Sequence, residues 1–233
     1  MDEHITGQGK AVPMSQTSKN PSIKTPVTCS LLSTCTIDAA ARAYTDVFVN
    51  DEPMTRQYHI DPATFLCHAR HYIRFCADTQ LSIIAWSADN NECAGFILCC
   101  DLVTDFSCLG PDITAFLSFF PESVALIDTL EDKYLDMDRV SGGNTLHIFQ
   151  LGVRRSYRNR GIATDLIRRI CVHAQERGFN KIVADCTGPV SRHVFGRCGF
   201  REIGHIPYDT FCTGSHTFFA GLEGGISLMS RDV

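Results

Sequence analysis

The stretch Arg158-Asn159-Arg160-Gly161-Ile162-Ala163 decides how this 233-residue chain is interpreted. It follows the strand-like apolar run 145–153, and apolar residues recur at helical spacing after it. A glycine at this point permits a tight turn and lets a ligand approach the backbone. The first turn of a helix offers unpaired N–H groups and the positive end of the helix dipole, which together receive anions. Because Arg158 and Arg160 add positive charge beside these donors, the stretch predicts a cradle for a pyrophosphate.

This pattern resembles the GNAT superfamily of acyl-CoA-dependent N-acyltransferases. The central motif of that family is Gln/Arg-x-x-Gly-x-Gly/Ala between a strand and a helix, and Arg158, Gly161 and Ala163 match it. The strand-like run 181–186 and the pair Gly199-Phe200 follow in the order typical of the family. The resemblance implies an α/β (α+β) fold, the GNAT fold, in which a central, mixed but mostly antiparallel sheet is flanked by helices.

The same resemblance implies acetyl-CoA as the co-substrate and no metal. The pantetheine amides should pair with the backbone of the motif strand, as an added strand would. The expected cofactor-binding residues are Leu151, Gly152, Val153, Arg158, Asn159, Arg160, Gly161, Ile162, Ala163 and Thr164.

Composition places the chain among ordinary globular proteins, with 44% hydrophobic and 20% charged residues. A net charge of -5 without a basic face argues against a nucleic-acid partner, and it suits a cationic amine. No apolar run reaches membrane-spanning length and the first residues lack a signal pattern, so we expect a cytoplasmic protein that does not bind membranes.

Twelve cysteines in a chain that is neither short nor visibly secreted indicate free thiols, most of them in apolar runs. The group Cys67, His68, His71 and Cys76 could suggest a metal site. It contains no Cys-x-x-Cys pair, and its members lie around several sides of a predicted helix, so no metal site is expected there.

The chain divides into a polar leader and one domain. Residues 1–26 show no apolar period and are expected to be disordered, whereas 27–233 should form a single acetyltransferase domain. Strands are predicted at 27–32, 81–87, 93–102, 145–153, 181–186, 201–206 and 217–229. Helices are predicted at 36–49, 62–77, 121–135 and 161–178, and another follows residue 187. Residues 103–143 form an insertion between two strands.

Three features resemble the insect-type arylalkylamine N-acetyltransferases. Asp51-Glu52-Pro53 looks like the Asp-Glu-Pro motif of that subfamily, although it could also be a simple helix stop. The segment from Ser191 to Phe200 is similar to its closing motif, and the insertion lies where the subfamily has one.

Two residues are candidates for the general base. A protonated amine must lose a proton before it attacks a thioester. Glu52 is the base that the resemblance implies, and desolvation would raise its pKa. His147 lies on the motif strand at a place resembling a histidine of vertebrate serotonin N-acetyltransferases, and its intrinsic pKa suits the task. It could equally be a histidine that packs against a neighbouring strand.

Two residues near the closing motif are candidates for the general acid. Many members of the family use a tyrosine four residues before the closing Gly-Phe region, and this chain has Phe195 there. In the arylalkylamine type serines of this region have the role, which points to Ser191 and, nearby, Thr187. Both could instead cap the helix that starts between them.

The expected function is transfer of an acetyl group, by direct attack, to the primary amine of a small arylalkylamine or polyamine-type substrate. A protein lysine or N-terminal acetyltransferase and a non-catalytic acyl-CoA-binding sensor are the alternatives. Aromatic walls formed by Phe48, Tyr58, Phe116 or Phe119 would favour a small aromatic amine, and an open groove would favour a peptide.

Overall fold

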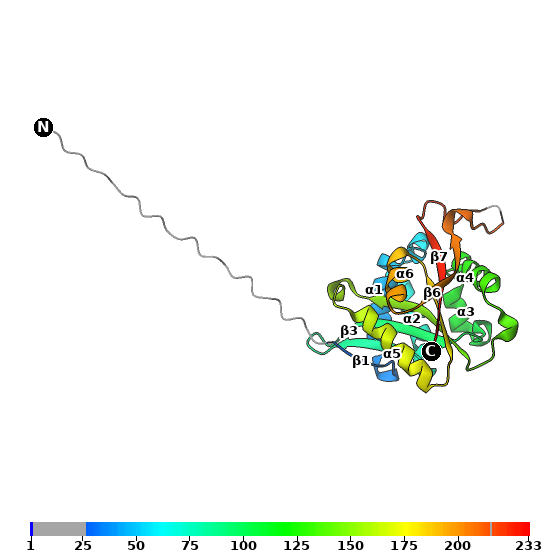
Figure 1. The fold of residues 1–233 in the computed structure, drawn as a ribbon. Helices are drawn as coiled ribbons and strands as arrows, with labels where there is room; N and C mark the ends of the chain where they lie inside the picture. Colours follow the sequence, from blue (N-terminus) through cyan, green and yellow to red (C-terminus); the bar gives the residue numbers. More distant parts are fainter. Residues whose placement is uncertain (2–26, 215) are drawn as a thin grey trace.

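The computed structural model describes Met1, residues 27–214 and residues 216–233. Except for Met1, the predicted leader lies outside the described residues. A seven-stranded sheet with the order β1-β2-β3-β4-β5-β7-β6 forms the centre of the molecule (Figure 1). All neighbouring strands are antiparallel except β4 and β5, which are parallel, so the predicted mixed, mostly antiparallel sheet is confirmed. The strands are β1 (Val27–Leu31), β2 (Ile83–Ser87), β3 (Glu92–Asp101), β4 (Thr145–Val153), β5 (Lys181–Cys186), β6 (Arg201–Pro207) and β7 (Gly225–Asp232).

Helices cover both faces of this sheet. They are α1 (Ile37–Asp51), α2 (Pro62–Asp78), α3 (Pro111–Leu117), α4 (Pro121–Tyr134), α5 (Ile162–Glu176) and α6 (Pro189–Arg197). Alternate residues of β5 belong to different cores: Ile182 and Ala184 pack in the cluster of α5, and Val183 packs in the cluster of α4. One face of the sheet is therefore covered by α5 and α6. The other is covered by α1, α2 and α3 near β3 and by α4 near β6 and β7 (Figure 1).

Three predicted segments differ clearly from the elements in the structure. The insertion forms two helices, α3 and α4, where only the second was predicted. Helix α1 continues to Asp51, at the residue before Glu52-Pro53. The last predicted strand, 217–229, was wrong in its first half: the strand begins only at Gly225. Gly221 and Gly224 adopt φ angles of 93° and 87°, which turn the chain and prevent an extended segment there.

Within the described residues, no single helix is long and apolar enough to cross a membrane. Helices α3 and α4 together reach that length and composition, but they meet at a bend of 91° and bury Phe116, Leu126 and Leu130 in the protein core. All twelve cysteines are free thiols, and seven of them are buried.

The pairing of β4 with β5 stops halfway along β4. The two strands pair only from Thr145 opposite Lys181 to Ile148 opposite Ala184. The register with β3 shifts at the same place, because Cys99 is opposite Ile148 and Leu98 is opposite Gln150, which leaves Phe149 as an extra residue. Such a bulge bends and twists its strand. Beyond it, β4 follows β3 and separates from β5, which creates a fork in the middle of the sheet.

A glycine on β6 allows α4 to dock beside this fork. Tyr134, the last residue of α4, lies against Gly204 and donates a hydrogen bond from its hydroxyl to the carbonyl oxygen of His205 (3.0 Å). A Cβ atom added at Gly204 would lie well inside van der Waals contact with the Tyr134 ring and 2.9 Å from its Cβ.

We expect Gly204→Ala to lower the free energy of unfolding by about 1–3 kcal/mol, because α4 must shift away from β6. Gly196→Ala is the matched control. An added Cβ at Gly196, in α6, meets nothing within 4 Å, and alanine should stabilise that helix by up to about 1 kcal/mol. Urea denaturation of both variants measures the two changes. Equal stability of the variants would mean that α4 does not depend on this close approach.

Candidate functional site

The predicted pyrophosphate cradle lies at the start of α5. Gly161 is the residue before the first helical turn and adopts a left-handed conformation (φ 79°, ψ 3°). An added Cβ would meet nothing within 4 Å, so the glycine is favoured by its backbone conformation rather than by crowding. Gly161 has no side chain that could cap the helix, so the N–H groups of the first turn are available to an anion.

The arginines of the motif are less free than the sequence suggested. Arg158 donates from Nε to the carbonyl oxygen of Val153 (2.9 Å) and from its guanidinium to the carboxylate of Asp51. Arg155 donates to the same carboxylate from Nε (2.8 Å). Arg160 donates to the carbonyl oxygen of Ser156 (2.7 Å). The loop before α5 is therefore tied to the end of α1 through Asp51.

Asp51 stays ionised in this arrangement. Partial burial would raise the pKa of its carboxyl group, but the hydrogen bonds and charges of Arg155 and Arg158 outweigh burial and hold the pKa below its usual value. The carboxylate is 15% exposed. Asp51 thus holds the guanidinium groups of Arg155 and Arg158 beside the start of the Glu52 segment.

The predicted pantetheine-binding residues form the free half of β4. Leu151, Gly152 and Val153 pair with β3 and have no partner on β5. A Cβ atom at Gly152 would collide with the ring of Phe96, so this glycine is needed for packing across the sheet. The backbone of this half of β4 faces the fork, where an extended ligand could pair with it.

Glu52 follows the end of α1, where its side chain binds the start of a short 3-10 turn. Its carboxylate oxygens accept hydrogen bonds from the backbone N–H of Met54 (3.1 Å) and of Thr55 (2.5 Å), at the start of the turn Thr55–Tyr58. Its φ and ψ angles of -76° and 124° are those expected before a proline. The helix-stop interpretation therefore describes the local structure, and it does not exclude a chemical role.

The segment after Glu52 meets the end of β5. The ring of Pro53 lies 3.8 Å from the place of a Cβ on Gly188. Tyr208 donates from its hydroxyl to the carbonyl oxygen of Thr187 (2.7 Å), and the charge of Glu52, after burial, raises the pKa of that tyrosine. The structure therefore brings Glu52 and Thr187 into one region. Tyr208 also lies in this region, and the sequence analysis did not predict it.

The helix-cap interpretation of Thr187 and Ser191 is wrong. Gly188 is the residue that precedes α6, and the hydroxyl of Ser191 donates to the carbonyl oxygen of that glycine (2.9 Å). Phe195 is fully buried and packs against Phe200 with ring centroids 5.0 Å apart. No phenol is available at the position where many relatives carry one.

His147 is completely buried between two carboxylates. Its Nε2 lies 2.8 Å from Oδ2 of Asp185, on β5, and its Nδ1 lies 3.3 Å from Oε1 of Glu131, on α4. The side chain of Asp185 is 2% exposed and that of Glu131 is 17% exposed. Asp185 is the first residue of β5 beyond the end of its pairing with β4, so the cluster lies at the fork.

The three groups influence one another electrostatically. Burial opposes a charged imidazole, but the carboxylate of Asp185 and then that of Glu131 raise the pKa of His147 above its ordinary value. Burial raises the pKa of Glu131 to about 7, against the charge of His147. The pKa shifts of His147 and Glu131 both depend on the interaction between these two groups. We assign the charge of His147 to its shorter bond with Asp185, which leaves Glu131, farther away and partly exposed, as the group that titrates near neutral pH.

The donor atoms of Glu131, His147 and Asp185 all lie within 4.8 Å of one another, as in many metal sites. The ring orientation does not favour a single bound ion. Each ring nitrogen faces a different carboxylate, so one ion could not take a ring nitrogen and both carboxylates without breaking the bond to Asp185. The sequence carried a signal for this cluster, because Asp185 interrupts an apolar strand and Glu131 follows Ile127 by four residues on an apolar helix face.

The remaining sequence candidates lie elsewhere. Phe116 is fully buried in the core of α1 and α2 and forms no wall, whereas Phe48, Tyr58 and Phe119 are half-buried around it. Cys76 is buried on the inner side of α2, and Cys67 and His71 are exposed on its outer side.

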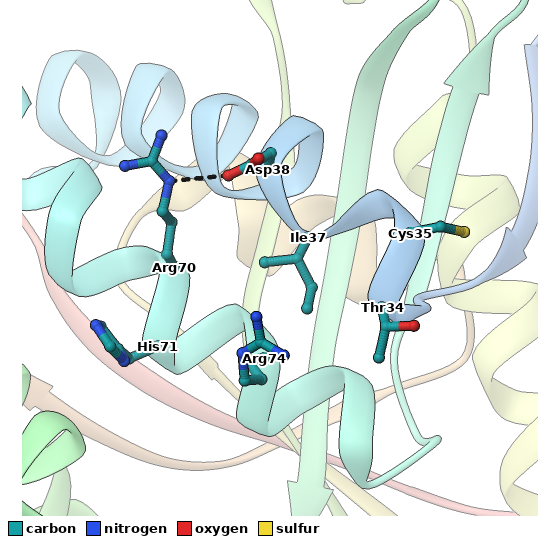
Figure 2. A pocket seen from close by; sticks show the side chains of 7 residues that line it. All are labelled: Thr34, Cys35, Ile37, Asp38, Arg70, His71 and Arg74. Atoms are coloured by element: carbon teal, nitrogen blue, oxygen red, sulfur yellow. Dashed lines mark hydrogen bonds and ion pairs between the residues drawn. The ribbon is translucent and has the colours of Figure 1, made fainter.

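Two surface hollows are present in the described structure. One, of about 280 Å³, is formed by the first residues of α1 and by Arg70, His71 and Arg74 of α2, and Figure 2 shows Arg70 reaching toward Asp38 (2.9 Å). It lies at the opposite end of α1 from Glu52. The other, of about 350 Å³, is lined by Val49 and residues of 55–60. Neither contains a residue of the cradle or of the buried cluster.

Comparison with known proteins gives a family match over residues 50–200, to the acetyltransferase (GNAT) family. A curated relative, a probable glucosamine 6-phosphate N-acetyltransferase 2 of rice (Oryza sativa subsp. japonica), is 36% identical over 63 residues. That match covers 27% of this chain and only 37% of the length of the rice protein.

Solved structures share the fold. An insect arylalkylamine N-acetyltransferase 7, described as putative, from the mosquito Aedes aegypti superposes with a TM-score of 0.73 at 21% identity, covering 88% of this chain and 87% of the other. The acetyltransferase yncA of Salmonella typhimurium, solved with acetyl-CoA, superposes with a TM-score of 0.55 at 13% identity, covering 89% and 94%. These likenesses establish the fold, and the family match extends over more than half of the sequence, from before Glu52 to Phe200. The chain belongs to the acetyltransferase (GNAT) family.

Proposed function

We propose that this protein transfers an acetyl group from acetyl-CoA to the primary amine of a small arylalkylamine or polyamine-type substrate, by direct attack. The observation that carries the proposal is the fork between β4 and β5, which opens beside the uncapped first turn of α5. An acyl carrier with a pyrophosphate at one end and an extended amide chain at the other matches this geometry. The chemistry named for the mosquito and bacterial structures supports the choice of amine and of donor.

In this proposal the pyrophosphate rests on the N–H groups from Gly161 to Thr164, with Asn159 and Arg160 beside it. Arg158 contributes charge from its place between Asp51 and Val153. The pantetheine arm adds to the free edge of β4 along Leu151, Gly152 and Val153. The thioester then lies near the closed end of the fork, close to the cluster of Glu52, Thr187 and Ser191.

We assign the general base to Glu52. The substrate ammonium gives one proton to this carboxylate, which passes it to solvent, and the amine lone pair forms a bond with the thioester carbonyl carbon. The attached nitrogen then gives its second proton to the same carboxylate. The carbon–sulfur bond then breaks, and the thiolate leaves with the bonding electrons. In this proposal Thr187, just after β5, and Ser191, in the first turn of α6, contact the departing sulfur. His147, the other candidate for the base, lies between two carboxylates that favour its protonated form, which suits a base poorly.

Release of free CoA thiol from acetyl-CoA in the presence of different amines separates the proposal from its alternatives. The panel should hold an arylalkylamine, a polyamine, glucosamine 6-phosphate and a lysine peptide. Turnover of the peptide alone would indicate a protein acetyltransferase. Tight binding of acetyl-CoA without turnover of any amine would indicate a sensor.

Gly161→Asp tests the cradle. It places a carboxylate where the pyrophosphate should lie, so the affinity for acetyl-CoA should fall by at least ~100-fold, or roughly 3 kcal/mol of binding free energy. Gly178→Asp is the matched control: Gly178 follows the other end of α5, has a φ of 88° and is also open to solvent. Both variants suffer similar backbone strain. Titration calorimetry that finds equal acetyl-CoA affinity in the two folded variants would refute the cofactor site.

Glu52→Gln tests the base. The amide keeps an oxygen that can accept from Met54 but cannot take a proton, so turnover should fall ~100- to 10,000-fold while acetyl-CoA still binds. The decline of turnover toward low pH, which reports protonation of the base, should vanish. Glu176→Gln, on the exposed end of α5, is the control. Steady-state kinetics over a range of pH provide the measurement, and an unchanged acidic limb in a folded variant would assign the base to another group.

A further inference from the structure

The proposed reaction leaves one proton without a donor. The departing thiolate must become a thiol, and the position of the usual tyrosine is occupied by Phe195, buried against Phe200. The hydroxyl proton of Ser191 is directed to the carbonyl oxygen of Gly188. In addition, the Ser191 hydroxyl could donate its proton to the thiolate only if another group then replaced that proton.

The buried cluster at the fork has the properties of a proton store. Three of its polar atoms make no hydrogen bond within the described structure: Asp185 Oδ1, and the facing pair His147 Nδ1 and Glu131 Oε1, which lie 3.3 Å apart as an ion contact. Unsatisfied buried polar atoms are costly, and they are found where a network has a chemical task or exchanges protons. His147 and Asp185 are sealed from solvent, whereas Glu131 is 17% exposed. Of these three described groups Glu131 is the most exposed, so it is the group through which the cluster would exchange a proton with solvent.

We propose that Glu131 is the general acid of this enzyme and that the His147–Asp185 pair positions and recharges it. This inference rests on the proposed function. The O–H bond of neutral Glu131 breaks as the thiolate takes the proton and forms the S–H bond of CoA. The resulting carboxylate is stabilised by protonated His147, and it regains a proton from solvent. The substrate nitrogen loses two protons through Glu52, one before and one after the attack, and Glu131 takes up one, so the net release is one proton in each turnover.

The charges around Glu131 are consistent with this role. Asp185 keeps the imidazole protonated from the buried side, through the 2.8 Å bond to Nε2. Asp128 and Asp132, on α4 itself, disfavour a second negative charge and help Glu131 to hold its proton. Cys100, facing from β3, is buried with its thiol pKa raised and carries no charge. With a pKa near neutral, Glu131 is a stronger acid than an ordinary thiol, so transfer to the thiolate is favourable.

Glu131→Gln should lower turnover by up to about 100-fold, the lower end for general acid–base catalysis, because a thiolate is a moderately good leaving group. The loss of wild-type turnover at high pH, which reports ionisation of the acid, should be absent in this variant, whereas Glu52→Gln should lose the acidic limb. The affinity for acetyl-CoA and the urea midpoint should match those of wild type and of Glu176→Gln. Retention of the wild-type basic limb by folded Glu131→Gln would overturn the assignment.

A leaving-group test distinguishes chemistry from a merely structural effect. The selenium analogue of acetyl-CoA releases a selenolate, which is a weaker base than the thiolate and needs less protonation. The defect of Glu131→Gln should shrink with this donor, and that of Glu52→Gln should not. An equal defect with both donors would overturn the proposal, because Glu131 would then act only through structure.

A measurement without turnover completes the test. The ring ¹⁵N signals of His147 in the unliganded wild-type protein should indicate two protonated nitrogens at pH 7, and neutral imidazole would contradict the proposal. Failure of the proposed function has a different signature. In that case the wild-type protein would neither bind acetyl-CoA nor release CoA thiol with any amine, whereas failure of the Glu131 assignment leaves wild-type turnover intact.

Discussion

The separation of β4 from β5 after Ile148 and Ala184 is the constraint on which the rest of the structure depends. Parallel strands normally stay paired because unpaired backbone groups inside a protein are costly. Here the bulge at Phe149 bends β4 away, and β3 alone continues to pair with it. The free edge of β4, the first turn of α5 and the end of β5 then converge on one opening, which is why a single structural irregularity can organise a whole site.

The helices around this fork are held by close contacts between the layers. Asp51 ties the end of α1 to the loop before α5 through two arginines, so the Glu52 segment and the anion cradle are parts of one unit. Gly204 lets Tyr134 reach β6, which sets α4 at the height where Glu131 meets His147. Buried charges need partners, and this docking supplies them. The acidic residues on both sides of His147 therefore have a structural function as well as the chemical one that we propose.

The two carboxylates near the fork differ in a way that suits opposite roles. The carboxylate oxygens of Glu52 accept hydrogen bonds from the backbone N–H groups of Met54 and Thr55, beside the end of β5. Glu131 is desolvated and next to other acids, an arrangement that favours a neutral, proton-donating one. Environment rather than residue type separates an acid from a base, since both side chains are glutamates.

Much of this architecture could be predicted from the sequence, because its signals are local. The glycine at 161 between an apolar strand and an amphipathic helix indicated the family and the start of α5, and Asp61-Pro62 marked the start of α2. The order of strands and helices followed from hydrophobic periodicity. The first half of the strand predicted at 217–229 was wrong. Phe218 and Phe219 have strand-like composition, but they lie in a packed loop because Gly221 and Gly224, which follow them, turn the chain.

Only the tertiary structure decided which distant residues meet. Glu131, His147 and Asp185 come from three elements separated by 16 and 38 residues, and nothing local links them. The engagement of Arg158 by Asp51, and the proximity of Glu52 to the end of β5, likewise depend on how the layers pack. Sequence periodicity determines which face of an element is buried, but the pKa and the partner of a buried group depend on atoms brought in from elsewhere by folding. The sequence by itself thus determined the fold and the loop that we propose for the cofactor, and packing determined the partners of the groups to which we assign acid–base roles.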